Sequence, residues 1–201
     1  MRDKMAQKTE IAIFGGGCFW CTEAIFKMLK GVVSVMPGYA GGPSPSLSAV
    51  SSGLNRSGRA PSYEEVRSGT TGHAEVTRIE YDPEKISFRD LLTVFFVTHD
   101  PTTPERQGNA VGPQYRSIIL TTSRSQQEEA ERFIKEIDAS HPGGAPVITE
   151  VKPLDKFYEA EEEHRDYYKK NPQKSYCQLI INPKLEKVQG KFEELLKNNE
   201  K

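Results

Sequence analysis

The chain of 201 residues has only three cysteines, one tryptophan and no long apolar run. A membrane-spanning helix needs about 18 or more consecutive apolar residues, which occur nowhere, and the opening "MRDKMAQKTE" lacks the apolar segment of a signal peptide. Strong charge of either sign is also missing, because 27 Lys and Arg nearly balance 28 Asp and Glu. We therefore expect a cytoplasmic protein without a membrane or nucleic-acid partner.

The cysteine content excludes two further classes of protein. Three cysteines in a chain of ordinary domain length fit reactive thiols in a reducing compartment better than a framework of structural disulfides. A zinc site built on Cys18, Cys21 and Cys177 would need a fourth ligand from a second CxxC or HxxxH pair, and the sequence has neither. We expect no bound metal.

Apolar periodicity predicts strands and helices that do not alternate strictly. Strands are expected in "IAIF", "VVSVMPGYAGG", "HAEVTRIEYDP", "YRSIILTT" and "PVITEVK", and helices in "CTEAIFKMLKG", "SFRDLLTVFFVTHD", "SRSQQEEAERFIKEIDAS", "EAEEEHRDYYKKN" and "NPKLEKVQGKFEELLKNN". Mixed order of this kind favours an α+β fold over a doubly wound sheet. Residues 43–60 are rich in Ser, Pro and Gly and predict a long surface loop.

The stretch "GGGCFWCTE", residues 15–23, holds the strongest chemical signal. A cysteine that begins a helix after a strand and a glycine turn meets free backbone N–H groups and the positive end of the helix dipole, and both favour a thiolate. Cys18 is therefore the expected reactive thiol. Cys21 follows one helical turn later, within reach of a disulfide. The intervening Phe19 and Trp20 are either core residues or the walls of a small apolar pocket.

Two further stretches contain candidate site residues. Glu75 enters a strand among apolar neighbours, where a carboxyl can keep its proton and serve as an acid. Tyr115 lies in a loop dense in Gly, Pro and polar residues, and its hydroxyl either donates to a substrate or belongs to a ring that only packs.

Eight segments, in order from Ile11 to Phe192, together resemble peptide methionine sulfoxide reductases of the A type. They are "GCFWCTE", "GYAGG", "YEEVRSGTTGHAE", "YDPEKISFRDLL", "HDPTTPERQGN", "QYRS", "FYEAEEEHRDYY" and "YCQLIINPKLEKV". The resemblance implies a mixed sheet with a split β-α-β (ferredoxin-like) core, flanking helices and long irregular loops. One catalytic domain would span residues 1–201, with a family-like core at 10–192, the loop insertion at 43–60 and a C-terminal tail at 193–201.

The resemblance also implies the reaction, namely reduction of the S epimer of methionine sulfoxide, free or in proteins, without a cofactor. Cys18 matches the nucleophile, and Glu75 matches the acid that protonates the sulfoxide oxygen. Phe19 and Trp20 match the pocket for the substrate methyl group, and Tyr63 and Tyr115 match the hydroxyl donors. Attack by Cys18 would leave a sulfenic acid, which a second thiol converts to a disulfide, and thioredoxin or a similar dithiol would then reduce that disulfide.

Some choices stay open at this point. The family usually has Asp where Ala110 stands. The resolving thiol is either Cys21, favoured by local geometry, or Cys177, favoured by family position, and we expect a relay that uses both. Two other functions fit the CxxC alone: a thioredoxin-like disulfide oxidoreductase, and a non-enzymatic thiol module that senses redox state or binds metal.

Overall fold

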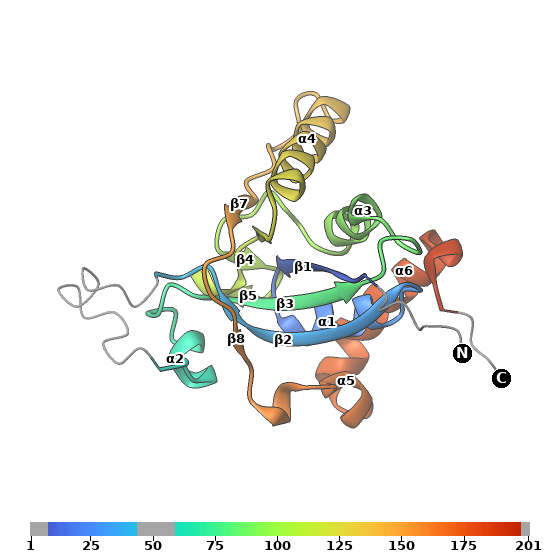
Figure 1. Cartoon of the computed structure of the whole chain (residues 1–201). Coiled ribbons are helices and arrows are strands. Elements are labelled where there is room, and N and C mark those ends of the chain that lie inside the picture. Colours follow the sequence, from blue (N-terminus) through green and yellow to red (C-terminus); the bar gives the residue numbers. More distant parts are fainter. Residues whose placement is uncertain (1–7, 44–58, 198–201) are drawn as a thin grey trace, which may run out of the picture.

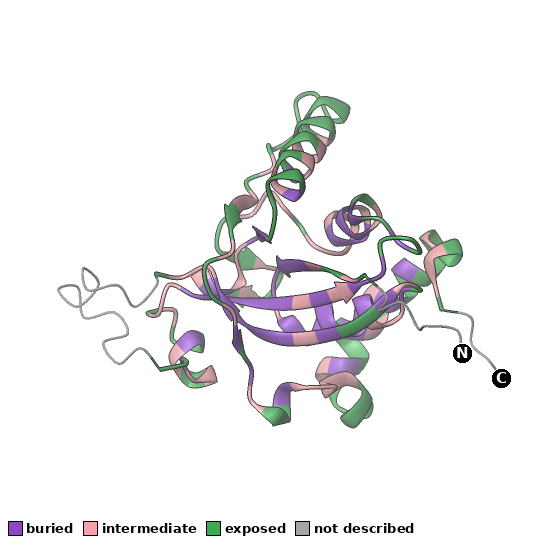
Figure 2. Ribbon diagram, viewed as in Figure 1, coloured by how far each residue is buried: buried purple, intermediate pink, exposed green. Residues whose placement is uncertain are grey.

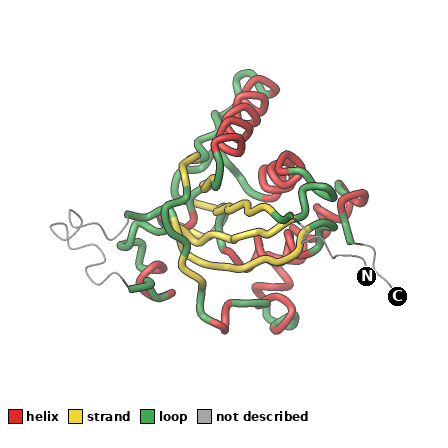
Figure 3. The backbone as a smooth tube through the Cα atoms, viewed as in Figure 1, coloured by secondary structure: helices red, strands yellow, loops and turns green. Residues whose placement is uncertain are grey.

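The computed structural model describes residues 8–43 and 59–197, which form a six-stranded mixed sheet with flanking helices (Figure 1, Figure 3). The strand order is β7-β6-β1-β3-β2-β8, and β6–β7 is the parallel pair. The central order β6-β1-β3-β2 is that of a split β-α-β core, which confirms the predicted α+β class. The strands are β1 (Glu10–Gly15), β2 (Val32–Ala40), β3 (Ala74–Tyr81), β6 (Ile118–Thr121), β7 (Glu150–Pro153) and β8 (Tyr158–Glu159), with a separate ribbon of β4 (Arg106–Gln107) and β5 (Ala110–Val111).

Helices differ from the sequence-based expectation mainly in the last third of the chain. The helix expected over residues 159–171 is instead a short strand, a 3₁₀ turn and one helical turn, because Asp166 adopts a left-handed φ of 55°. The terminal helix ends at Lys191 rather than reaching residue 199. The helices are α1 (Phe19–Lys27), α2 (Tyr63–Arg67), α3 (Phe88–Thr98), α4 (Arg124–Ser140), α5 (Tyr167–Lys170) and α6 (Asn182–Lys191), with 3₁₀ turns η2 (Pro113–Tyr115), η3 (Glu162–His164) and η5 (Glu193–Leu195) and a π-helix η4 (Cys177–Ile181).

The main core lies between the sheet and the helices α1 and α3 (Figure 2). Phe14 of β1 stacks on Phe95 of α3 at a centroid distance of 4.8 Å and approaches Phe26 of α1 at 5.6 Å, so both helices cover the same face. On the opposite face the segment from β7 to β8 crosses the sheet, and its Leu154 and Phe157 cover the apolar side chains there (Figure 1). Strand alternation therefore decides which residues of β3 face the helices.

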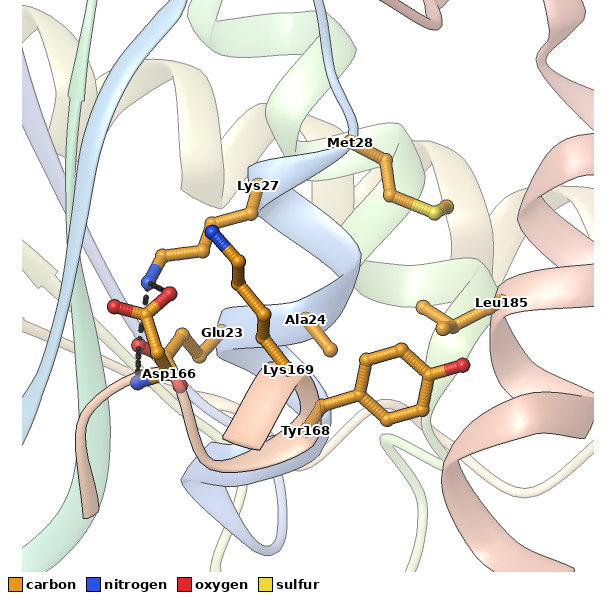
Figure 4. Close-up of a pocket in the computed structure, with 8 residues that line it drawn as sticks. All are labelled: Glu23, Ala24, Lys27, Met28, Asp166, Tyr168, Lys169 and Leu185. Atoms are coloured by element: carbon orange, nitrogen blue, oxygen red, sulfur yellow. Dashed lines mark hydrogen bonds and ion pairs between the residues drawn. The ribbon is translucent and has the colours of Figure 1, made fainter. Parts of the chain in front are cut away.

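An ionic cluster fixes α1 to the start of α5 (Figure 4). Lys27 Nζ lies 2.8 Å from Glu23 Oε1 and 2.7 Å from Asp166 Oδ1, and the backbone N–H of Asp166 donates to the same Glu23 oxygen. The cluster borders a cavity of about 310 Å³ between α1, α5 and α6. Because Glu23 is buried and its Oε1 contacts both Lys27 and the backbone of Asp166, the cluster fixes α1 against the start of α5.

The C-terminal segment returns to the end of α1. The backbone N–H of Lys30 donates to Leu195 O, and that of Lys197 donates to Met28 O, both at 2.8 Å. The helices of residues 8–43 and 59–197 include none with the length and hydropathy to span a membrane. Residues 44–58 of the expected surface loop lie outside the described residues.

Candidate active site

A glycine turn places Cys18 at the N-terminus of α1. Gly17 has a φ of +96°, which side chains disfavour, and a Cβ at Gly15 would lie 2.8 Å from the carbonyl oxygen of Glu75. The glycines therefore allow β1 to end close against β3 and the chain to turn directly into the helix. Cys18 is the N-cap residue, with φ −63° and ψ 126°, and it is partly exposed.

Glu75 lies on the helix-covered face of β3 and is 1% exposed. Its Oε2 accepts a hydrogen bond from the backbone N–H of Phe19 at 3.1 Å. Burial raises the pKa of Glu75 to about 8, although that hydrogen bond favours the charged form. The elevated pKa agrees with the sequence-based expectation. A carboxyl of this kind is largely protonated at neutral pH and can donate a proton beside Cys18.

Two effects of opposite sign act on the thiol of Cys18, since the N-terminus of α1 favours the thiolate whereas burial disfavours it. Burial raises the pKa of Cys18 well above its ordinary value, and its hydrogen bond to Cys21 and the charge of Glu75 act in the same direction. Loss of hydration outweighs the helix dipole at this position. The proton of Cys18 must therefore leave before its sulfur can attack.

Cys21 faces Cys18 from the first turn of α1 and is 3% exposed. The hydroxyl of Tyr176 lies 3.6 Å from its Sγ. The hydrogen bond from Cys18 lowers the pKa of Cys21, with further contributions from the positive charge of Lys184 and from Tyr176. The two thiols, one helical turn apart, therefore titrate as a coupled pair.

Tyr63 and Tyr115 reach the same place from different elements. Tyr63 opens α2, whose capping box joins Ser62 and Glu65, and Tyr115 ends the turn η2. Burial raises the pKa of both hydroxyls, and the negative charge of Glu75 raises them further. Both groups therefore keep their protons and can donate hydrogen bonds toward an oxygen near Glu75.

The two aromatic residues between the cysteines differ in environment. Phe19 is 1% exposed and stacks on Tyr63 at 6.2 Å, so it belongs to the core as well as to the site. Trp20 is half-buried and stacks face to face on Tyr167, with centroids 3.6 Å apart and planes 4° apart. The edge of Tyr176 contacts Trp20 at 5.7 Å. Trp20 therefore presents a flat apolar surface beside the thiols.

Cys177 lies in the main core, away from solvent. It is the first residue of the π-helix η4 and is 0% exposed. Burial raises the pKa of its thiol, and so does the charge of Cys21. A cavity of about 410 Å³ opens between η4 and the residues that follow α3, and its lining includes both Cys18 and Cys21 but not Cys177. Ala110 also lines it.

Sequence reasoning missed several residues that contact the site, among them His164, whose ring lies 4.3 Å from that of Tyr63 and 5.7 Å from that of Trp20. Tyr176 touches Cys21, and Tyr167 stacks on Trp20. The one local signal was that Tyr176 directly precedes Cys177, whereas Tyr167 fell within a segment expected to be a charged helix. Among the residues that the structure describes, no three His, Cys, Asp or Glu side chains converge as metal ligands.

Comparison with known proteins places this arrangement in a family. The family model of peptide methionine sulfoxide reductase matches residues 10–196. The peptide methionine sulfoxide reductase MsrA of Sulfolobus acidocaldarius is 51% identical over 183 residues, which cover 91% of this chain and 95% of the relative. That of Thermus thermophilus is 46% identical over 188 residues, covering 94% and 98%.

Solved structures agree with the sequence relatives. Mxr1 from Saccharomyces cerevisiae in reduced form superposes with a TM-score of 0.73 at 33% identity, over 86% of this chain and 91% of that one. Methionine sulfoxide reductase A of Corynebacterium diphtheriae gives 0.68 at 32% identity, over 87% and 79%. With the glycine turn, the paired thiols and the buried carboxyl in place, the chain belongs to the peptide methionine sulfoxide reductase family.

Proposed function

We propose that this enzyme reduces the S epimer of methionine sulfoxide, free or in proteins, with Cys18 as nucleophile and Glu75 as acid. The observation that carries the assignment is the buried carboxyl of Glu75, 1% exposed and hydrogen-bonded to the backbone N–H of Phe19, directly after the thiol of Cys18 at the N-terminus of α1. A sulfoxide sulfur becomes a good electrophile when its oxygen is protonated, so an uncharged carboxyl is the group that such a thiol requires.

The first half of the cycle transfers oxygen from substrate to enzyme. Glu75 donates its proton to the sulfoxide oxygen, Tyr63 and Tyr115 donate hydrogen bonds to the same oxygen, and Cys18 attacks the sulfur. The attack forms a bond between Cys18 Sγ and the substrate sulfur, and the proton of Cys18 restores the Glu75 carboxyl. The hydroxyl then passes to Cys18 Sγ as this S–S bond and the substrate S–O bond break, which leaves methionine, with the electron pair on its sulfur, and a sulfenic acid on Cys18. Phe19 and Trp20 hold the methyl group.

The second half of the cycle restores the thiols. Cys21 attacks the sulfenic acid, forming the Cys18–Cys21 disulfide and releasing water. Its position one helical turn after Cys18, its place beside Cys18 on the wall of the same cavity and its lowered pKa support this choice over Cys177. Thioredoxin or a similar dithiol then transfers two electrons to the disulfide. A reducing compartment such as the cytoplasm would keep the three free thiols ready for the cycle.

An assay with resolved epimers of a methyl sulfoxide and dithiothreitol tests the proposal. We expect turnover of the S epimer alone, and loss of turnover in Cys18→Ser. Cys21→Ser is the matched control, because it should still convert one equivalent of substrate per enzyme. Equal rates for the two epimers, or clear turnover by purified Cys18→Ser, would contradict the assignment. The family match argues against the thioredoxin-like and non-enzymatic alternatives.

A further inference from the structure

Two exposed apolar side chains lie at the cavity that contains the paired thiols. Leu179 is 72% exposed and Ile180 is 36% exposed, and both line the cavity together with Cys18 and Cys21. Isolated exposed apolar residues are common on protein surfaces, but two adjacent ones beside a reactive site indicate an interaction surface. We name Leu179 and Ile180, with the neighbouring Lys184, the cavity rim.

The cavity rim lies where a reductant must arrive. After Cys21 resolves the sulfenic acid, the disulfide lies at the wall of this cavity, and a new thiolate has to approach one of its sulfurs. Cys177 does not line the cavity and is fully buried. The positive charge of Lys184 already acts on Cys21 and would equally attract an incoming thiolate.

We propose that the cavity rim is the docking surface for the protein dithiol that reduces this enzyme, a partner of the thioredoxin type. The thiolate of the partner attacks Cys21 Sγ, the Cys18–Cys21 bond breaks, and Cys18 leaves with the electron pair. The second thiol of the partner then attacks the mixed disulfide, and Cys21 leaves with the partner oxidised. The inference rests on the proposed function.

An apolar rim suits such a partner better than it suits the substrate. The oxygen of the substrate must meet Glu75, and neither Glu75 nor Tyr63 nor Tyr115 lines this cavity. A protein reductant instead needs an apolar contact patch around its own active thiol, since burial of a few central side chains provides most of the affinity of an interface.

Variants of the cavity rim test the surface. Leu179→Ser and Ile180→Ser should each raise the KM for thioredoxin by about tenfold, as expected for central residues of an interface. Turnover with dithiothreitol and the KM for a methionine sulfoxide peptide should not change. Val33→Ser is the matched control, because Val33 is 54% exposed on β2 and does not line the cavity. Unchanged thermal unfolding would show that the variants fold.

Each of the following results would contradict the proposal that thioredoxin docks on the cavity rim. An unchanged KM for thioredoxin in both variants would contradict the docking surface. A raised KM for the peptide, measured with dithiothreitol, would show that the cavity rim binds substrate instead. A wild-type enzyme that works with dithiothreitol but not with thioredoxin would refute the partner class while leaving the proposed activity intact. Thioredoxin with its second active cysteine replaced by Ser should be trapped on Cys21; trapping on Cys177 would contradict the route.

Discussion

Two equally buried glutamates of this protein have opposite surroundings. Glu23 and Glu75 are both 1% exposed, but Glu23 forms an ion pair with Lys27, whereas no described cation pairs with Glu75. A buried carboxylate without a counter-charge is costly, so Glu75 retains its proton. The missing counter-charge is therefore what makes Glu75 an acid at neutral pH.

Glu75→Gln should lower the rate of sulfoxide reduction on the order of 10²- to 10⁴-fold with little change in substrate KM, because the amide cannot release a proton. In the wild type, loss of the Glu75 proton should lower activity as pH rises through about 8, against the rise that ionisation of Cys18 contributes, and Glu75→Gln should remove the Glu75 part of the profile. Rates with dithiothreitol from pH 6 to 10 test both statements, after correction for thiol ionisation of the reductant. A wild-type rate in Glu75→Gln at neutral pH would remove Glu75 from the mechanism.

The relay expected from the sequence can be tested at Cys177. Because Cys177 is buried and does not share the cavity of the other two thiols, we expect Cys177→Ser to keep near-normal thioredoxin-dependent turnover. Cys21→Ser should lose it while still reducing one equivalent of substrate. Loss of turnover in Cys177→Ser would instead establish that the relay passes through Cys177.

At the scale of elements, the short helix α2 determines the position of Tyr63, which is its first residue. It has five residues, too few to be stable alone, and the capping box between Ser62 and Glu65 supports its first turn. The carboxylate of Glu161 adds a hydrogen bond from the backbone N–H of Tyr63. The position of Tyr63 therefore depends on the local capping box and on the distant Glu161.

Ser62→Ala should cost about 1 kcal/mol of stability and also reduce kcat/KM for methionine sulfoxide, because α2 would hold Tyr63 less well. The chain offers a matched control in Ser87→Ala, which removes the equivalent capping box of α3. We expect that control to lose similar stability in urea unfolding but to retain its kinetics. An equal loss of kcat/KM in Ser62→Ala and Ser87→Ala would show that the loss follows from lower stability and not from the position of Tyr63.

The sequence predicts an element well when the residues that stabilise it are close together along the chain, and poorly when they are distant. The spacing of apolar residues predicts the long strands and α3, and the capping box of α3 confirms Ser87 as its N-cap. The helix expected at 159–171 fails because Asp166 turns left-handed and pairs with Lys27, which is distant in sequence. For the same reason the sequence could nominate Cys18 and Glu75 but not the contact of Tyr176 with Cys21, which joins segments 155 residues apart.

At the scale of the whole molecule, the partly buried His99 makes the free energy of unfolding depend on pH in acid. His99 hydrogen-bonds Phe95 O at 2.7 Å and Ser117 Oγ at 2.8 Å, and burial lowers its pKa to about 4. An unfolded histidine binds its proton near pH 6.5. The contribution of neutral His99 to the free energy of unfolding is therefore fully present above about pH 6.5 and is lost as pH falls toward 4.

His99→Gln should flatten this acid decline in the free energy of unfolding, by an amount on the order of 1.4 kcal/mol for each pKa unit involved. Urea titrations at pH 4 to 8 measure the slope. His141→Gln, at the exposed end of α4, is the control variant. An unchanged slope in His99→Gln would mean that other groups control acid unfolding.

The stack of Trp20 on Tyr167 has an optical consequence. Because the chain has one tryptophan, all indole emission comes from a ring that lies between Cys18 and Cys21 in sequence and against Tyr167 in space. Thiolates and disulfides quench indole fluorescence differently, so each oxidation state of the pair should have its own emission intensity. Stopped-flow fluorescence of the unlabelled enzyme can thus follow substrate turnover and the arrival of the reductant in real time, without a dye near the site.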